Sequence, residues 1–382
     1  MAGLYIHIPF CRSKCLYCDF YSGGSRIADW NSYVETLLLE LKQRGEEFSE
    51  PFDTLYIGGG TPSLMPDENF SFLMESISGC IDAGKLEEFT IEVNPEDVSE
   101  KKCELWKTNG VNRVSIGVQS MIDNELKNIG RRHTSEEAAN AVRLLKKYFD
   151  NVSIDVMFGL PGQDRYSYRK TLEEILSLQP QHISSYSLML EEGTAMTNLV
   201  GRGVVNLPDE EEWLLLFEMT KQSLKEAGYE HYEISNYAQP GFESRHNSSY
   251  WLGLPYLGLG PGAHSYDGER IRRANPADLK GYLKYYSEIP ALKEDASDRY
   301  FFIEEYLSNE ELAEEMIMTR LRMKSGLNLD EFSDKFGNQQ AVRLKEKAEN
   351  FIERGELAMS GESLHLTEQG ILLSDYILSS LI

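Results

Sequence analysis

Six short runs of β-branched and aromatic residues alternate with amphipathic stretches through the first half of this chain. The predicted strands are Leu4–Ile8, Thr54–Ile57, Glu88–Val93, Arg113–Val118, Ser153–Phe158 and His182–Leu188. The predicted helices are Trp30–Gln43, Asn69–Cys80, Glu100–Asn109, Ser135–Tyr148, Ser167–Leu178 and Asp209–Ala227. Regular alternation of this kind favours a parallel α/β architecture, in which functional residues gather in the loops at the carboxyl ends of the strands.

Polar residues and glycines follow these strands where such a site would lie. A cysteine-rich loop follows the first strand, and Gly58-Gly59-Gly60-Thr61-Pro62 follows the second. Glu92 closes the third strand, Gln119 follows the fourth, and Asp155 lies in the fifth. We therefore expect these residues to share one rim of the sheet.

The loop after the first strand contains three cysteines, Cys11, Cys15 and Cys18, with the spacing C-x3-C-x2-C. Three thiolates can hold three irons of a four-iron cluster and leave the fourth iron open, whereas a structural zinc site uses four protein ligands. The alternative is three buried thiols on one face of a helix. Cys80 and Cys103 stand alone on predicted helices and are interpreted as packing residues.

Composition excludes several classes of protein. The 382 residues include 62 acidic and 38 basic side chains, for a formal charge of −24, so a general nucleic-acid surface is not expected. No run of 18 apolar residues occurs, which predicts no integral membrane segment. The start of the chain has no pattern of a secretory signal, and the five cysteines, three of them clustered, suit a reducing compartment. We expect a cytoplasmic protein.

The second half of the chain has a different pattern. Residues Tyr229 to Asn275 lose periodicity and are rich in Gly, Pro, His, Tyr and Trp, which predicts a structured loop region. Beyond Leu279 the chain is acidic and helical, with predicted helices Glu310–Met323, Leu329–Phe336, Gln339–Glu353 and Thr367–Ser379 and a two-stranded ribbon within Gly355–Leu366. These patterns predict a barrel domain over 1–228, a connecting region over 229–278 and a winged-helix-like domain over 279–382.

The cysteine loop and the glycine run together resemble the radical S-adenosylmethionine (SAM) superfamily. The resemblance extends to the branch that contains the oxygen-independent coproporphyrinogen III dehydrogenases (HemN) and the heme chaperones (HemW). It rests on Leu4 to Cys11, Gly58 to Pro62, Ile91 to Pro95, Ser115 to Ser120, Gly130-Arg131, Ile154-Asp155 and Phe158 to Gly162. The resemblance implies a partial (β/α)6 barrel with a helical C-terminal domain, a [4Fe–4S] cluster on the three cysteines, and SAM chelated to the open iron.

Position by position, the resemblance implies a SAM pocket lined by Tyr5, Gly59, Gly60, Thr61, Glu92, Gln119, Arg131 and Asp155. The chemistry agrees, because SAM offers a carboxylate to Arg131, a ribose diol to Gln119 or Asp155, and an ammonium to Glu92. Singly, Glu92 and Asp155 could be strand-end residues capping a loop, and Arg131 a surface cation.

Two departures separate the branches. The dehydrogenases have a further cysteine where this chain has Phe20, and a longer amino-terminal extension. Both differences put coproporphyrinogen III dehydrogenase activity in doubt and favour the chaperone type. The run His246-Asn247-Ser248-Ser249-Tyr250-Trp251 is similar to the element linked to heme in the chaperones, which makes His246 a candidate heme ligand and His264 the reserve. The alternative is that His246 forms hydrogen bonds within a turn.

The function implied by the resemblance is heme binding and delivery to acceptor hemoproteins, with respiratory proteins among the candidates. An electron donor such as a flavodoxin or ferredoxin would serve the cluster. The alternatives are a radical enzyme that oxidises coproporphyrinogen III, and a cluster-bearing scaffold that has lost its chemistry.

Overall fold

The computed structural model describes residues 2–24, 29–45, 51–78, 85–288 and 302–382. Its main sheet contains six parallel strands in the order β1-β4-β5-β6-β7-β8. Their bounds are Ala2–Ile8, Phe52–Gly59, Glu88–Val93, Arg113–Gln119, Asn151–Phe158 and His182–Ser187. The predicted strands and the parallel α/β barrel fold are therefore confirmed.

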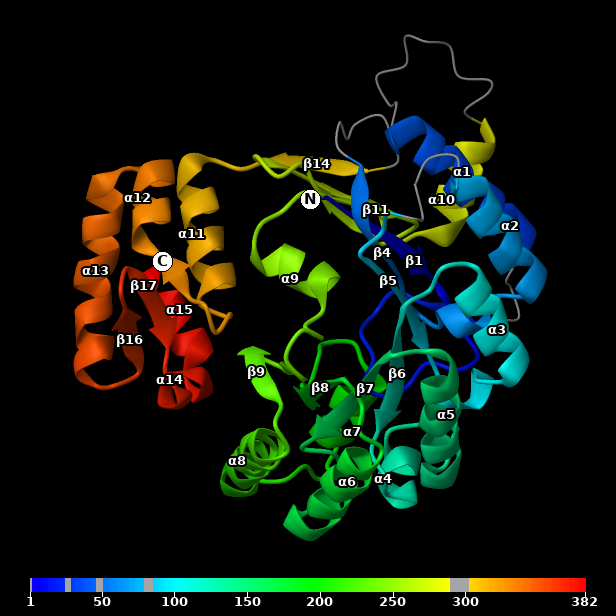
Figure 1. The fold of residues 1–382 in the computed structure, drawn as a ribbon, viewed down its shortest axis with the longest axis horizontal. Helices are drawn as coiled ribbons and strands as arrows, with labels where there is room; N and C mark the ends of the chain where they lie inside the picture. The colour runs from blue at the N-terminus through cyan, green and yellow to red at the C-terminus, as the bar shows by residue number, and fades with distance from the viewer. Residues whose placement is uncertain (1, 25–28, 46–50, 79–84, 289–301) are drawn as a thin grey trace.

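Helices cover the outer face of these strands, as Figure 1 shows. The long ones are α1 (Trp30–Arg44), α2 (Asp67–Ile77), α3 (Glu100–Thr108), α5 (Ser135–Tyr148), α6 (Arg165–Ser177) and α8 (Glu210–Glu226). Helix α5 begins at a capping box of Thr134 and Glu137 and buries its alanine, valine and leucine side chains against the sheet. The predicted end of the second helix at Cys80 lies outside the described residues, whereas Cys103 is buried on α3 as expected.

Several shorter elements complete this part of the chain. They are the strands β2 (Phe10–Cys11) and β3 (Gly23–Gly24), the helices α4 (Asp123–Asn128) and α7 (Ala195–Gly201), and the 3-10 turns η3 (Pro62–Leu64) and η4 (Pro95–Asp97). Both 3-10 turns begin with proline directly after a strand-end loop, which fixes the direction in which the chain leaves the rim.

The region predicted as loops, Tyr229 to Asn275, contains regular structure. Strand β11 (Tyr256–Leu259) adds to the sheet beside β1 in parallel, and β12 (His264–Tyr266), β13 (Ile271–Ala274) and β14 (Ile303–Tyr306) extend it antiparallel. At the other end lie β10 (Asn236–Ala238) and β9 (Glu230–Glu233), and helix α9 (Arg245–Trp251) connects the two ends. Each strand has only three or four residues, too few for a periodic pattern to identify.

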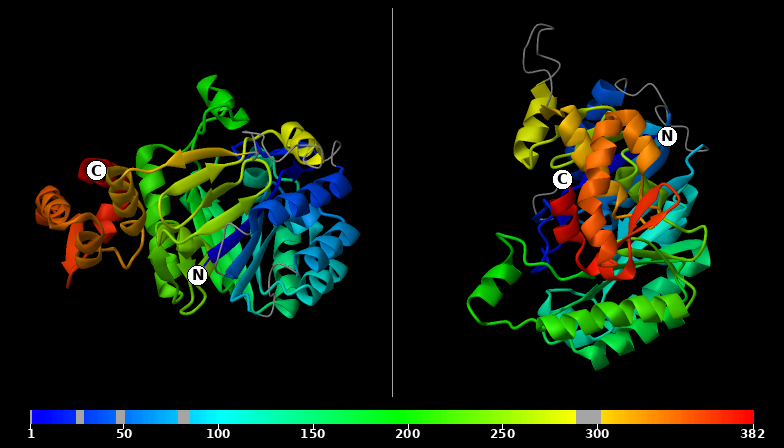
Figure 2. Two further views of the ribbon diagram at one scale, coloured as in Figure 1. Left: turned by 90° about the horizontal axis from the view of Figure 1, so that it is seen from above. Right: turned by 90° about the vertical axis from the view of Figure 1, so that its left-hand side faces the viewer.

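The last part of the chain forms a separate hydrophobic core. Its elements are α11 (Asn309–Arg320), β15 (Leu327–Asn328), α12 (Leu329–Phe336), α13 (Asn338–Glu353), β16 (Leu357–Ser360), β17 (Ser363–Leu366), α14 (Glu368–Leu372) and α15 (Ser374–Leu381). We call residues 307–382 the C-terminal unit; the left view of Figure 2 shows most of its helices at one end of the molecule. The predicted ribbon is present with a third strand, β15, and the predicted last helix is divided into two.

Helix α10 (Leu279–Glu288) lies against α1 and buries Tyr282 and Tyr286 in the same hydrophobic core as the six parallel strands. We call the described residues up to 306 the barrel unit. The boundaries of the three predicted domains stay a prediction. In the described part of the chain, no helix combines the length and apolar character needed to cross a membrane.

Candidate cofactor-binding site

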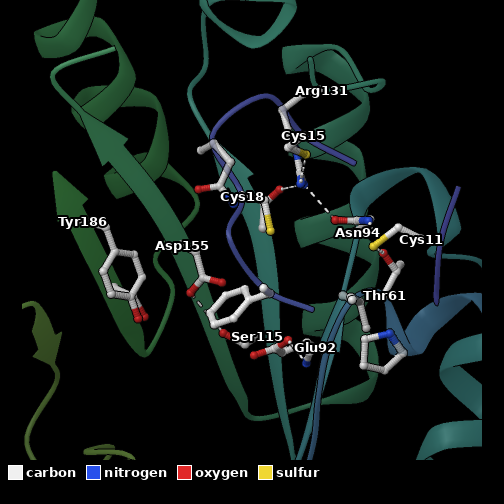
Figure 3. Close-up of a pocket in the computed structure, with 18 of the residues that line it drawn as sticks. Cys11, Cys15, Cys18, Thr61, Glu92, Asn94, Ser115, Arg131, Asp155 and Tyr186 are labelled. Carbon is white, nitrogen blue, oxygen red and sulfur yellow. Dashed lines mark hydrogen bonds between the residues drawn. The ribbon is translucent and has the colours of Figure 1, made fainter. Parts of the chain in front are cut away.

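A cavity of about 360 Å³ opens at the carboxyl ends of the parallel strands (Figure 3). Its walls include Cys11, Cys15, Cys18, Tyr56, Gly59, Gly60, Thr61, Glu92, Asn94, Ser115, Gln119, Arg131, Asp155, Tyr186 and Asn247. The structure thus brings together the three cysteines and every residue expected in the SAM pocket except Tyr5. What these residues bind stays a prediction.

The cysteine loop is not helical, so the alternative of three thiols on one helix face is wrong. The backbone N–H of Cys18 donates to the carbonyl oxygen of Cys15 at 3.3 Å, which folds the loop into a turn. Leu16 fixes the turn from both sides, since its N–H donates to Ile129 at 3.1 Å and its carbonyl accepts from Met196 at 2.7 Å. The loop is held by other elements before any ligand binds.

All three thiols are free, and two of them have polar neighbours. The hydroxyl of Thr61 lies 3.4 Å from Cys11 Sγ, and Arg131 Nη1 lies 3.7 Å from Cys15 Sγ. Burial raises the pKa of the Cys18 thiol to about 11, so loading iron at this loop would release a proton.

The described residues include no group of three His, Cys, Asp or Glu side chains arranged around a single metal ion. In an iron–sulfur cluster, by contrast, each ligating thiolate binds a different iron. Three soft donors from one ordered turn, beside a cavity, fit three irons of such a cluster. Donors such as Thr61 and Arg131 near ligating sulfurs would favour their thiolate form.

The glycine run brings backbone close to this turn. The N–H of Gly60 donates to the carbonyl oxygen of Ile8 at 2.7 Å. A Cβ atom at Gly60 would lie 2.7 Å from the carbonyl oxygen of Phe10 and 2.8 Å from that of Ile8, so only glycine fits. Gly59 has φ of +103° and donates its N–H to Glu92 Oε2 at 3.0 Å. The run thereby ties β4 to both β1 and β5 at the rim.

Glu92 has a strongly shifted protonation equilibrium. It accepts hydrogen bonds from the Tyr56 hydroxyl at 2.7 Å and from Gly59, but burial in the cavity wall outweighs them and raises the pKa of Glu92 to about 7. A bound ammonium would favour the ionised form. Burial also raises the pKa of Asp155, whose carboxylate accepts a hydrogen bond from Ser115 at 3.1 Å.

Arg131 reaches the cavity from the segment after α4 (Figure 3). Its Nη2 donates to Asn94 Oδ1 at 2.8 Å and to the carbonyl oxygen of Gly117. Its Nε is buried, and no described residue accepts a hydrogen bond from it. A guanidinium with this spare donor suits a ligand carboxylate. Gln119 has φ of +69°, in the left-handed region that non-glycine residues rarely adopt, a strain that concentrates at functional sites.

Two predicted residues do not line the cavity. Tyr5 lies behind its wall, with its ring centroid 6.0 Å from that of Tyr56 and its hydroxyl 3.1 Å from His7. His246 is fully buried, with Nδ1 2.8 Å from the Thr54 hydroxyl and Nε2 2.8 Å from the Tyr250 hydroxyl.

Both ring nitrogens of His246 are therefore occupied, and burial lowers its pKa to about 3. Binding iron would require one of these hydrogen bonds to open, so the role of His246 as a heme ligand stays a prediction. His264 is exposed on β12.

Three residues that were not predicted also line the cavity: Tyr56, Tyr186 and Asn247. Alternation along β4 places Tyr56 on the same face as Gly58, and alternation along β8 places Tyr186 with Ser184, which also lines the cavity. Asn247 had no such signal, because it arrives from α9, far away in the chain. Phe20, which stands where the dehydrogenases have their further cysteine, is 62% exposed and lines the same cavity.

Comparison with known proteins agrees with this geometry. Residues 5–175 match the radical SAM superfamily, and residues 307–373 match the HemN C-terminal domain. The structure of coproporphyrinogen III oxidase (HemN) from Escherichia coli has the same fold, with a TM-score of 0.82 and 21% identity over all of this chain and 89% of that one.

Curated relatives are similar over nearly the whole chain. The heme chaperone HemW of Lactococcus lactis is 36% identical over 98% of this chain and 95% of its own length. The heme chaperone HemW of Bacillus subtilis is 33% identical over 99% and 98% respectively. A mitochondrial radical S-adenosyl methionine domain-containing protein of Danio rerio is 31% identical over 100% of this chain and 87% of its own length. This chain belongs to the HemW family of the radical SAM superfamily.

Proposed function

We propose that this protein is a heme chaperone, which binds a [4Fe–4S] cluster, SAM and heme and delivers heme to acceptor hemoproteins. The observation that carries the proposal is the similarity to several proteins named heme chaperone HemW, which spans both the barrel unit and the C-terminal unit. Phe20 in the cavity wall supports it further, because the dehydrogenases have cysteine there.

The cluster would be held by Cys11, Cys15 and Cys18, and when bound it supplies single electrons to SAM. The chain holds these three cysteines in an ordered turn before the cluster binds. Thr61 and Arg131 place hydrogen-bond donors beside two of the sulfurs, which stabilises negative charge on them.

SAM would lie against the glycine run with its carboxylate at Arg131. The ionised form of Glu92 would receive its ammonium, and Asp155 or Gln119 its ribose hydroxyls. Gly60 allows this close approach because its missing Cβ leaves the backbone open. Tyr186 adds an apolar wall on the opposite side of the cavity (Figure 3).

We propose that the protein acts in the cytoplasm and that a flavodoxin or ferredoxin reduces its cluster. Respiratory hemoproteins are among the proposed acceptors of heme. The formal charge of −24 suits a freely diffusing protein rather than one bound to a nucleic acid.

The test begins with anaerobic cluster reconstitution of the full chain. Hemin titration followed by mixing with a heme-free b-type cytochrome measures binding and transfer. A parallel reaction supplies coproporphyrinogen III, SAM and reductant, with the Phe20→Cys variant beside the wild type. Stoichiometric heme binding, transfer to the cytochrome and no decarboxylated product is the expected result. Protoporphyrinogen formation by the wild type would make the protein an oxidase and overturn the proposal.

A further inference from the structure

A second, larger cavity of about 850 Å³ lies between the barrel unit and the C-terminal unit. Helix α8 and strands β9 and β10 supply one wall, and the β16–β17 ribbon and α14 supply the other. The volume falls within the roughly 300–1,000 Å³ typical of pockets for small molecules. The cavity is separate from the cysteine site, since none of its lining residues is shared with that cavity.

An imidazole in this cavity is prepared to bind a metal. His231 Nε2 lies 3.1 Å from the carbonyl oxygen of Ile234. A carbonyl can only accept, so Nε2 carries the proton and Nδ1 keeps its lone pair. Histidines that ligate metals have this arrangement, in which one ring nitrogen donates to a carbonyl and the other binds the metal. The ring is also held in place by stacking on Tyr237, with centroids 4.2 Å apart and planes at 7°.

Two lysines give the cavity an anion-binding edge. Lys221 and Lys225 both point their ammonium groups at one carboxylate, Glu368, at 3.8 and 3.2 Å. The side chain of Glu368 is 72% exposed at the start of α14, so these contacts contribute little stability. A ligand carboxylate can therefore replace Glu368 at low cost.

We propose that this cavity between the two units is the heme site, with His231 as an axial ligand to the iron and Lys221 and Lys225 as partners of the propionates. This inference rests on the proposed function, because it takes heme as the cargo. A planar dicarboxylate with a central metal matches the three features together: a free imidazole lone pair, two cations at one edge, and aromatic walls from Tyr229 and Tyr237. His246, in contrast, has no free ring nitrogen.

The experiment is a hemin titration of the full chain, followed by the Soret band, with three variants. His231→Ala should weaken binding about tenfold or more and shift the Soret band, and added imidazole should restore the wild-type band. Glu368→Gln removes the carboxylate that both lysines contact, while Lys221 keeps its ion pair with Glu218 at 3.2 Å. This variant should tighten binding about two- to fivefold. The His246→Ala variant tests the competing ligand and should show the wild-type Soret position.

Metal-free protoporphyrin provides the control for cavity integrity. Its fluorescence should report equal binding to the wild type and to His231→Ala, because only the iron bond is lost. If the wild type does not bind hemin, the proposed function fails. If the wild type binds hemin but the Soret band moves in His246→Ala and stays at the wild-type position in His231→Ala, the proposed function stands and this inference is overturned.

Discussion

Glu92 makes the stability of the protein without cofactors depend on pH, and replacing it with glutamine should remove that dependence. The pKa of Glu92 is raised from 4.5 to about 7 because the carboxyl is buried among Tyr56, Gly59 and Asp155. Glutamine keeps an oxygen that can accept the Tyr56 hydrogen bond but carries no charge at any pH. The comparison therefore isolates the cost of ionising this carboxyl.

Whether the free energy of unfolding rises or falls with pH depends on which chain, folded or unfolded, holds the proton of Glu92 more tightly. Below pH 4.5 Glu92 is protonated in both the folded and the unfolded chain and contributes nothing. Between pH 4.5 and about 7 the unfolded chain ionises freely while the folded chain resists, so the free energy of unfolding falls as pH rises. The shift of 7 − 4.5 units, at about 1.36 kcal/mol per unit, gives a total loss of at most about 3 kcal/mol. Water entering the cavity makes this an upper bound.

The assay is urea unfolding of wild type and Glu92→Gln at pH 5, 6, 7 and 8, followed by tryptophan fluorescence. The stability of the wild type relative to the variant should fall across this series and level off above pH 7. Glu136→Gln, at an exposed position on α5, is the matched control and should follow the wild type. Parallel profiles for wild type and Glu92→Gln would refute the assignment of a buried, proton-holding Glu92.

Three further outcomes are expected. Replacing any one of Cys11, Cys15 and Cys18 with alanine should abolish the absorbance near ~400 nm of the reconstituted protein. Cys103→Ala, which changes a thiol in the core, should keep that absorbance. Gly60→Ala should destabilise the fold by about 1–3 kcal/mol in urea, because its Cβ meets backbone oxygens, while Gly201→Ala, with open space around it, should not. Arg44→Met should cost about 3 kcal/mol, since it leaves the buried Glu40 without its ion pair at 3.1 Å, and the double change with Glu40→Met should recover part of this loss in the same assay.

Local signals explain which elements were predictable. Helix Ser135–Tyr148 was predicted with its observed bounds because a capping box, a long amphipathic pattern and terminal lysines all agree. Strand Glu88–Val93 was also predicted to the residue, as a short run bounded by polar segments. Strand β11 was missed, because Tyr256–Leu259 has four residues and becomes a strand only by pairing with β1.

The same distinction applies to the site. The cysteine spacing and the strand-end positions of Glu92 and Asp155 placed them at one rim, since parallel strands end on the same edge. Tyr186 follows from the alternation along β8, whereas Asn247 enters the cavity only because of how α9 is packed, which no spacing encodes. The hydrogen bonds that occupy both nitrogens of His246 likewise come from Thr54 on a distant strand and from Tyr250 one turn away.

The position of β1 in the middle of the sheet determines when the proposed cluster site can be completed during synthesis. Gly3 pairs with Thr54 on one side and with Tyr256 on the other, so the sheet around the first strand is incomplete until more than half of the chain has left the ribosome. The turn that carries the thiols also depends on Ile129 and Met196, which are made well after it. For that interval the three thiols lie on an unfinished scaffold and are accessible to oxidants. We therefore expect iron loading to follow translation, and oxygen to damage the nascent chain more than the completed fold.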